Sequence, residues 1–405
     1  MRGQLFRNLM WVALLLVSLS ETLILQWARI VVDISTLAWP GFLAALGVLA
    51  ALNLLFLFGV RRYSREVRAA WLATRVYMVG SVGALASGPL LGIAFAGVGA
   101  WLLASDLMGG GPEPKRAFAY AASGGVAVAL GFGSILYGFL VGQRRVVIEK
   151  VDVPMPHLPA RLAGLRIAHI TDLHIGPQLR APQLARFVER VNAVGAELIV
   201  ITGDIFDYDP QYIEEGCREL AKLHAPHGVF AVLGNHDLYT GAEAVAEGLA
   251  SLTGIRLLRD ESVALEIAGE RLFLLGIDDP GRGLIDHGVR SPALARMAQE
   301  LPQDEPRVLL VHRPSYLPQI AELGLPLALA GHTHGGQVTL PRRAEQLNIA
   351  RLVTPWTRGL YRAGDSLLYV NRGLGVTGLP VRLNCPREIA LVRLVRDTGL
   401  QLEAA

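Results

Sequence analysis

Four long apolar segments at the start of the chain constrain its fold more than any other feature. Three of them contain no charged residue and exceed the roughly 18 residues that mark a membrane-spanning helix; they lie at residues 34–60, 76–105 and 117–143. A fourth, residues 8–28, is apolar except for Glu21. Inside a bilayer every backbone polar group must be paired within the segment, so such segments fold as helices. The sequence therefore predicts a transmembrane helical domain over residues 1–150.

The number of these helices decides on which side of the membrane the rest of the chain lies. Four is the favoured number, but Ser87-Gly88-Pro89, near the middle of residues 76–105, leaves a kink or a short hairpin open, and a hairpin would make five. A cleaved signal peptide is an alternative for residues 8–28. With four helices, the short loops carry nine Lys and Arg on one side and three on the other. We therefore expect a multi-pass inner-membrane protein whose second domain is cytoplasmic.

Residues 151–405 have the composition of a soluble domain. They carry 25 Lys and Arg against 29 Asp and Glu, a net charge of −4, whereas residues 1–150 carry 13 against 6, a net of +7. A net acidic domain without a basic stripe argues against a nucleic-acid partner. The two cysteines, Cys217 and Cys385, are too few for a disulfide framework or a thiolate metal site, and we expect both to be buried.

Short apolar runs alternate with amphipathic segments from residue 165 onward, a pattern that predicts an α/β fold. The predicted strands lie at residues 165–170, 197–201, 228–233, 271–275, 308–311, 327–330, 367–371 and 388–395, and the predicted helices at 182–194, 214–223 and 242–252. Residues 154–159 contain three prolines and indicate an extended linker. We therefore divide the chain into residues 1–150 and 151–405.

Metal-binding side chains follow the ends of five of these predicted strands. The motifs are DLH (Asp172, His174), GDIFD (Asp204, Asp207), GNHD (Asn235, His236, Asp237), HRP (His312) and GHTH (His332, His334). Strands of an open α/β sheet present their carboxyl ends at one edge, so we expect these side chains to lie together. Asp, Asn and His without Cys suit Mn²⁺, Fe or Zn²⁺. Five such motifs predict two divalent metal ions, which activate water for attack on a phosphorus ester.

The series D-x-H, G-D-x-x-D, G-N-H-D, H and G-H-x-H resembles the calcineurin-like metallophosphoesterases over roughly residues 165–395. The helical N-terminus and residues 370–375 resemble the membrane-anchored bacterial branch often called YkuE- or YaeI-like. That branch commonly carries R-F-N-x-P-P-E near its end, where this chain has Arg387 in place of the second proline. The resemblance implies an α/β sandwich of two mixed β-sheets flanked by helices, and a metal-dependent hydrolase.

The resemblance also implies a role for each matching residue. Seven residues correspond to metal ligands: Asp172, His174 and His334 on the first ion, Asn235, His312 and His332 on the second, and Asp204 bridging both. His236 would act on the phosphoryl group, stabilising developing charge or protonating the leaving group. Asp207 would orient the His236 ring, as carboxylates near metal sites do.

Several polar residues outside this set have two interpretations. Asp237 is either the N-cap of the following helix or a catalytic group. Asp278 and Asp279 follow a predicted strand and are expected to form a turn rather than to support the metal site. His169 falls within a strand and is expected to be structural. Glu21 is expected to face the helix bundle, either protonated or bonded to nearby Ser or Thr, rather than to serve transport.

Residues 337–371 combine arginine with aromatic side chains, including Arg342, Arg343, Trp356 and Tyr361. The stretch directly follows the GHTH motif, so we expect it to overhang the metals. Its arginines would bind phosphate or diphosphate, and its aromatic rings would flank a base or a lipid chain. The alternative is a basic edge that lies on anionic lipid headgroups.

Three classes of function remain for comparison. Related enzymes cleave the diphosphate of UDP-2,3-diacylglucosamine in lipid A biosynthesis, so the resemblance makes that reaction a candidate, with a broad phosphodiesterase or phosphatase for small or lipid phosphates as the alternative. A non-catalytic membrane sensor would be indicated by the loss of His236 or of a ligand, and the sequence retains all of them. A transporter would need polar residues through the helices, where only Glu21 and Arg75 qualify.

Overall fold

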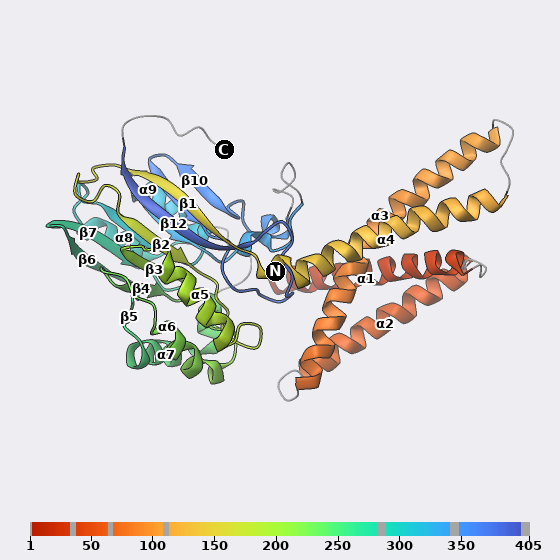
Figure 1. The fold of residues 1–405 in the computed structure, drawn as a ribbon, viewed down its shortest axis with the longest axis horizontal. Helices are drawn as coiled ribbons and strands as arrows, with labels where there is room; N and C mark the ends of the chain where they lie inside the picture. Colours follow the sequence, from red (N-terminus) through yellow and green to blue (C-terminus); the bar gives the residue numbers. More distant parts are fainter. Residues whose placement is uncertain are drawn as a thin grey trace. The chain divides into compact units, whose positions relative to one another are not determined.

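The computed structural model describes residues 2–32, 38–63, 68–107, 113–281, 289–340 and 348–397. The chain forms two compact units (Figure 1): one comprises Met1–Val141 and Leu379–Leu383, and the other comprises Gly142–Gly378 and Asn384–Ala405. The second unit therefore begins before the boundary near residue 150 that the sequence suggests.

The first unit is helical, with α1 (Arg2–Val31), α2 (Trp39–Tyr63), α3 (Arg68–Leu107) and α4 (Glu113–Leu140). Within the described residues these four helices are long and apolar enough to cross a membrane. The prediction of four apolar helices is confirmed, and the hairpin alternative is wrong, because α3 continues through Pro89 as one helix. A proline removes one backbone hydrogen bond, which a long helix packed among neighbours tolerates.

Small residues let these helices approach one another closely. A Cβ atom at Gly88 of α3 would lie 2.1 Å from the Ser20 hydroxyl oxygen of α1, and one at Gly131 of α4 would lie 2.1 Å from that of Ser87 in α3. Such contacts are typical of helices that associate in lipid, where packing rather than burial from water holds them together.

Glu21 belongs to a polar cluster that joins α1, α2 and α3. The amide nitrogen of Asn53 donates hydrogen bonds to Glu21 Oε2 at 2.8 Å and to Ser18 Oγ at 3.0 Å. The Tyr77 hydroxyl donates in turn to Asn53 Oδ1. Glu21 therefore faces the bundle as expected, but its bonding partner is an amide of the neighbouring helix rather than a serine or threonine.

The second unit contains two six-stranded sheets. The first has the strand order β1 (Val146–Met155), β12 (Arg387–Arg396), β2 (Arg166–Ile170), β3 (Leu198–Thr202), β4 (Val229–Val232) and β5 (Ile255–Leu257). All neighbours in it are parallel except β12 and β2. The second has the order β10 (Gly359–Ala363), β11 (Ser366–Val370), β9 (Leu327–Ala330), β8 (Arg307–Leu310), β7 (Glu270–Gly276) and β6 (Glu261–Ile267). It is antiparallel at both edges and parallel between them.

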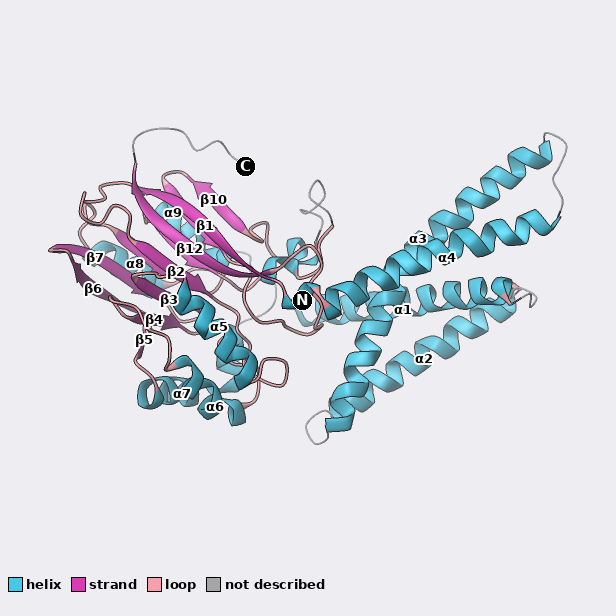
Figure 2. Ribbon diagram, viewed as in Figure 1, coloured by secondary structure: helices cyan, strands magenta, loops and turns pink. Residues whose placement is uncertain are grey.

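Three apolar clusters hold the sheets and helices in layers (Figure 2). One lies between the first sheet and α5 (Ala181–Ala193), α6 (Ile213–Leu220) and α7 (Asn235–Leu252); one lies between the two sheets; and one lies between the second sheet and α8 (Pro292–Glu300) and α9 (Leu317–Glu322). Successive strand residues point to opposite faces, so Ile167 packs between the sheets while Ala168 packs under the helices. The predicted sandwich of two mixed sheets flanked by helices is confirmed.

The first two residues of the predicted linker, Pro154 and Met155, are instead the end of a strand. Strand β1 extends to Met155 and pairs in parallel with β12, from Val146 opposite Arg387 to Met155 opposite Arg396. It lies at the edge of its sheet, where Pro154 can be accommodated because an edge strand leaves one row of backbone groups unpaired. Both cysteines, Cys217 and Cys385, are buried, as predicted.

Candidate metal centre

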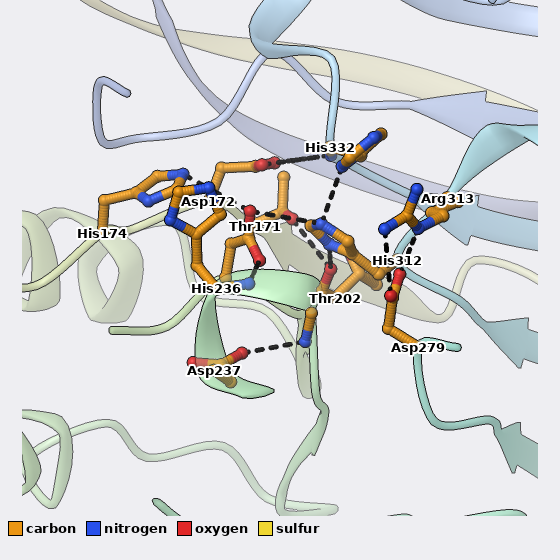
Figure 3. Close-up of polar contacts among 12 residues, drawn as sticks. Thr171, Asp172, His174, Thr202, His236, Asp237, Asp279, His312, Arg313 and His332 are labelled. Carbon is orange, nitrogen blue, oxygen red and sulfur yellow. Dashed lines mark hydrogen bonds and ion pairs between the residues drawn. The ribbon is translucent and has the colours of Figure 1, made fainter. Parts of the chain in front are cut away.

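The predicted site residues lie just after strand ends in both sheets. Asp172 and His174 follow β2, Asp204 and Asp207 follow β3, and Asn235 and His236 begin α7 after β4; His312 follows β8, and His332 and His334 follow β9. Strands β2, β3 and β4 are parallel neighbours in one sheet, and β8 and β9 are parallel neighbours in the other. The two sheets therefore bring motifs far apart in sequence to one site (Figure 3).

The side chains converge in two groups that share one carboxylate. In the first, His174 Nε2 lies 3.0 Å from His334 Nε2, which lies 3.3 Å from Asp172 Oδ1. In the second, His312 Nε2 lies 3.1 Å from His332 Nδ1. Asp204 lies between these groups, since its Oδ2 atom is 3.5 Å from His174 Nε2 and 3.3 Å from His312 Nε2. This is the arrangement that a bridging carboxylate requires.

The donor set fits two divalent metal ions. Each group offers ligand atoms within 4.8 Å of one another. Imidazole nitrogens and carboxylate oxygens gathered this closely are typical ligands of a divalent cation. The side-chain oxygen of Asn235 is buried without a hydrogen-bond partner among the described residues. Buried polar atoms are rarely left unpaired, so this oxygen is available to a ligand. The clustered His and Asp residues therefore fit a dinuclear metal site of undetermined metal identity.

Backbone strain concentrates in the same residues. Five of the predicted ligands have positive φ angles: Asp172 (51°), His174 (49°), Asp204 (51°), His332 (73°) and His334 (51°). Non-glycine residues rarely adopt this region, and each instance costs on the order of 1–3 kcal/mol. The surrounding fold therefore imposes a backbone conformation on these residues that they would rarely adopt in isolation.

Glycine next to the ligands permits the close approach of the loops. A Cβ atom at Gly331 would lie 2.1 Å from Thr171 Oγ1 and 2.3 Å from Asp172 Oδ2. The backbone nitrogen of His332 can therefore donate to the Asp172 carboxylate, at 3.0 Å from Oδ2. Gly331 thus joins the β9 loop to the β2 loop at the site.

The pKa values of the two buried carboxylates of the centre shift in opposite directions. Burial raises the pKa of Asp204, but His312 and His174 outweigh it and hold that pKa well below the usual range. Burial lowers the pKa of His312, but Asp204 raises it to about 10. Asp172 has a raised pKa because burial and the charge of Asp204 exceed the effect of the histidines. Two neighbouring buried carboxylates of this kind favour the binding of cations.

His236 is held beside this centre by Asp207. Its Nδ1 atom lies 2.9 Å from Asp207 Oδ1, and its backbone nitrogen donates to Asp204 Oδ1 at 2.8 Å. Burial raises the pKa of Asp207, but its hydrogen bonds with His174 and His236 hold it at about 2. An ionised Asp207 accepts the proton on Nδ1, which fixes the ring and leaves Nε2 as the nitrogen that can exchange a proton with a substrate.

A buried ion pair next to His312 was not expected from the sequence. Arg313 is fully buried, and its guanidinium binds Asp279 through Nε to Oδ2 at 2.5 Å and Nη2 to Oδ1 at 3.1 Å. Asp279 forms a turn as expected, since its Oδ1 atom accepts from the Gly281 backbone nitrogen at 2.8 Å, but the same carboxylate also pairs with Arg313. Asp278 differs, since it binds Arg259 at 2.9 Å and remains partly exposed. The available signal was an arginine directly after His312 and an aspartate after the neighbouring strand.

Asp237 is not the N-cap of α7, and its carboxylate accepts hydrogen bonds from backbone nitrogens. The N-cap is Gly234, whose backbone nitrogen donates to Asp237 Oδ2 at 2.8 Å. The carboxylate also accepts from the backbone nitrogens of Ile205 at 3.2 Å and Phe206 at 2.9 Å. Asp237 therefore ties the β3 loop to the start of α7. His169 is buried within β2 and bonds Thr202 Oγ1 at 2.8 Å, a structural position as expected.

The arginine and aromatic stretch is only partly described, because Arg342 and Arg343 lie outside the described residues. Its aromatic residues support the fold: the Tyr361 hydroxyl accepts from the Thr357 nitrogen at 2.9 Å, and Trp356 packs against the core behind the second sheet. Its proposed position over the metals stays a prediction. Arg387, which replaces a proline of the bacterial branch, donates to the Leu374 oxygen.

Part of the chain is similar to known phosphoesterases. The model of the calcineurin-like phosphoesterase family matches residues 165–336. Similar curated proteins include the metallophosphoesterase YkuE of Bacillus subtilis, 29% identical over 69% of this chain and 95% of its own length. They also include a transmembrane protein with metallophosphoesterase domain from Bos taurus, 28% identical over 62% of this chain and 58% of its own.

The matched segment does not span all of the similar proteins. It covers 63% of the metallophosphoesterase Cj0846 of Campylobacter jejuni, which is 29% identical over 61% of this chain. Among solved structures, a dimetal phosphatase from Danio rerio is 13% identical, with a TM-score of 0.38 and coverage of 58% of this chain and 94% of that chain. At that level of similarity the match bears on neither substrate nor chemistry.

Proposed function

We propose that this chain, which contains a calcineurin-like metallophosphoesterase domain and has homologues named as metallophosphoesterases, is a membrane-anchored enzyme that hydrolyses a phosphoester or diphosphate bond. One observation carries the proposal: Asp204 Oδ2 lies within 3.5 Å of one histidine from each ligand group. A carboxylate in that position can bind two metal ions at once. The seven ligands we propose are the residues named from the resemblance: the six that lie in the two groups and Asn235, whose buried side-chain oxygen has no hydrogen-bond partner among the described residues.

The residues around the centre have distinct roles in this proposal. Two divalent ions held here would lower the pKa of a water molecule between them and neutralise charge on the phosphoryl oxygens. His236, fixed through Nδ1 by Asp207, would donate a proton from Nε2 to the departing oxygen. Asp207 stays ionised at neutral pH, since its pKa is about 2, and so keeps the His236 ring in that orientation.

We further propose that the catalytic unit faces the cytoplasm at the inner membrane. Four spanning helices put the basic loops on the side of the second unit, and Lys and Arg concentrate on the cytoplasmic side. The helices themselves, and homologues named as transmembrane proteins, support membrane association. A protease added to sealed inverted vesicles should then cleave the catalytic unit, whereas protection there and cleavage in right-side-out cells would contradict this orientation.

The proposed substrate class follows from the location of the site in a membrane-anchored protein. An enzyme anchored in the bilayer meets phosphorylated lipids, so we propose a lipid-linked diphosphate such as UDP-2,3-diacylglucosamine, with small or lipid phosphates in general as the alternative. A non-catalytic sensor is disfavoured, because six of the proposed ligands lie in two clusters and His236 remains paired with Asp207. Lipid profiling after depletion of the protein separates the substrates: UDP-diacylglucosamine should accumulate, and an unchanged lipid pool would contradict that substrate.

The enzymatic activity has a direct test. Full-length protein in detergent should hydrolyse bis(p-nitrophenyl) phosphate with Mn²⁺ and stop when a chelator is added. Asp204→Ala should lose this activity, while Asp304→Ala, which changes an exposed aspartate of the same unit, should keep it. Similarly, His236→Ala should lower turnover by about 10²–10⁴-fold, whereas His224→Ala, at an exposed position, should not. Metal-dependent turnover that persists in Asp204→Ala would contradict the proposed bridge.

A further inference from the structure

Two tyrosines form a cluster with His236. The Tyr208 ring meets the His236 ring at 4.6 Å between centroids and an angle of 63°. The Tyr239 ring lies 5.6 Å from that of His236. The two tyrosine rings are nearly parallel, with 6° between their planes and 5.6 Å between centroids. Together the two stacked rings form an aromatic wall beside His236.

The elements that hold His236 also fix this wall. Tyr239 lies on α7 three residues after His236, so both side chains share one face of the helix. Tyr208 directly follows Asp207, whose carboxylate binds His236. The backbone of Tyr208 has a φ of 55°, a region that a bulky non-glycine residue adopts only when its surroundings impose it. The wall is therefore preorganised with the His236–Asp207 pair.

The wall is open to a ligand. Tyr208 is 59% exposed and Tyr239 is 46% exposed, whereas His236 beside them is only 8% exposed. Within the described residues of the second unit, these are the aromatic side chains among the exposed large hydrophobics. Two adjacent exposed rings beside a buried histidine leave apolar surface in contact with water. Covering that surface with a ligand is favourable.

We propose that Tyr208 and Tyr239 form a leaving-group subsite that takes a planar aromatic group attached to the departing oxygen of the phosphoester. This inference rests on the proposed function, because His236 is there the proton donor to that oxygen. The departing group then leaves on the His236 side, which is where the tyrosine rings lie. Parallel rings favour a flat aromatic partner over an alkyl group, since stacking adds to simple burial.

A pair of small ligands tests the subsite without turnover. Phenylphosphonate and methylphosphonate share the phosphonate head and differ only in the ring, so their affinity ratio isolates the wall. Titration calorimetry on full-length protein with Mn²⁺ should give about three- to tenfold tighter binding of phenylphosphonate, the range that one aromatic contact contributes. In Tyr208→Ala and Tyr239→Ala this ratio should fall toward one.

Matched variants separate the ring from other effects. Tyr208→Phe and Tyr239→Phe keep the ring and should retain the phenyl preference. Leu252→Ala removes an exposed apolar side chain near the other end of α7 and should also retain it. A parent protein that binds both phosphonates equally, or alanine variants that keep the full preference, would overturn the subsite.

The same experiments distinguish the subsite from the proposed function. If the parent prefers phenylphosphonate and the alanine variants lose that preference while no ester is hydrolysed, the subsite stands and the enzymatic proposal fails. If bis(p-nitrophenyl) phosphate is hydrolysed but the phosphonate preference is absent, the enzymatic proposal stands and the subsite is refuted.

Discussion

Replacing Gly331 with alanine should disable the metal centre through a single methyl group. The new Cβ would lie 2.1 Å from Thr171 Oγ1 and 2.3 Å from Asp172 Oδ2, whereas ordinary contact begins at 3.4 Å. The β9 loop and the β2 loop must therefore separate by more than an ångström. Thr171 cannot easily move, because its hydroxyl donates to the Thr202 oxygen at 3.0 Å. Overpacking of this kind costs about 1–3 kcal/mol of stability.

The larger effect should be on function. Gly331 adjoins His332, so the shift separates a ligand of one metal group from Asp172 of the other. A misplacement of about 1 Å typically lowers turnover by roughly 10²-fold. We expect Gly331→Ala to lose metal affinity and about this factor in the hydrolysis of bis(p-nitrophenyl) phosphate. The matched control is Gly254→Ala, where the new Cβ meets nothing within 4 Å. A Gly331→Ala protein with parental metal binding and turnover would refute this reasoning.

Two further substitutions probe the support of the site, both by pulse proteolysis across a urea series. Asp279→Ala removes the carboxylate that binds the buried Arg313 and should destabilise the catalytic unit by about 3–5 kcal/mol. The control Asp278→Ala should cost under about 1 kcal/mol. Equal urea midpoints of unfolding for the two variants would contradict a structural role for the ion pair. Burial lowers the pKa of His169 to about 3, below its unfolded value of about 6.5, so the stability it contributes is complete above pH 6.5 and declines as pH falls toward 3. With chelator present, lowering the pH from 7.5 to 5 should reduce the free energy of unfolding of the parent by about 2 kcal/mol more than that of His169→Gln. Equal reductions in the two proteins would show that His169 is not held neutral.

The sequence alone predicted the features that rest on local patterns. Uninterrupted apolar runs can only be helices in a bilayer, which is why four spans were foreseen and why Pro89 did not divide α3. Buried strands read as short apolar runs, and polar side chains directly after them, such as Asp172 and Asp204, could be placed at one sheet edge. Parallel pairing of β2 with β3 brings these two together, whereas His312 comes from β8 of the second sheet.

Features that depend on contacts across the fold were not predictable in this way. The pairing of Asp279 with Arg313 requires knowing that the loop after β7 meets the loop after β8. The strand β1 was missed because its edge position tolerates Pro154, which in isolation indicates a linker. Asp237 was assigned from its place near a helix start, yet its carboxylate serves the backbone of the β3 loop.

The most direct test of the dinuclear centre is the number of divalent metal ions bound per chain. Full-length protein loaded with Mn²⁺ and freed of excess metal should contain two ions per chain by elemental mass spectrometry. Asp204→Ala should contain fewer than two, because it lacks the carboxylate shared by both ligand groups, while Asp304→Ala should retain two. A parent protein with one ion or none, or an Asp204→Ala protein that still holds two, would contradict the account.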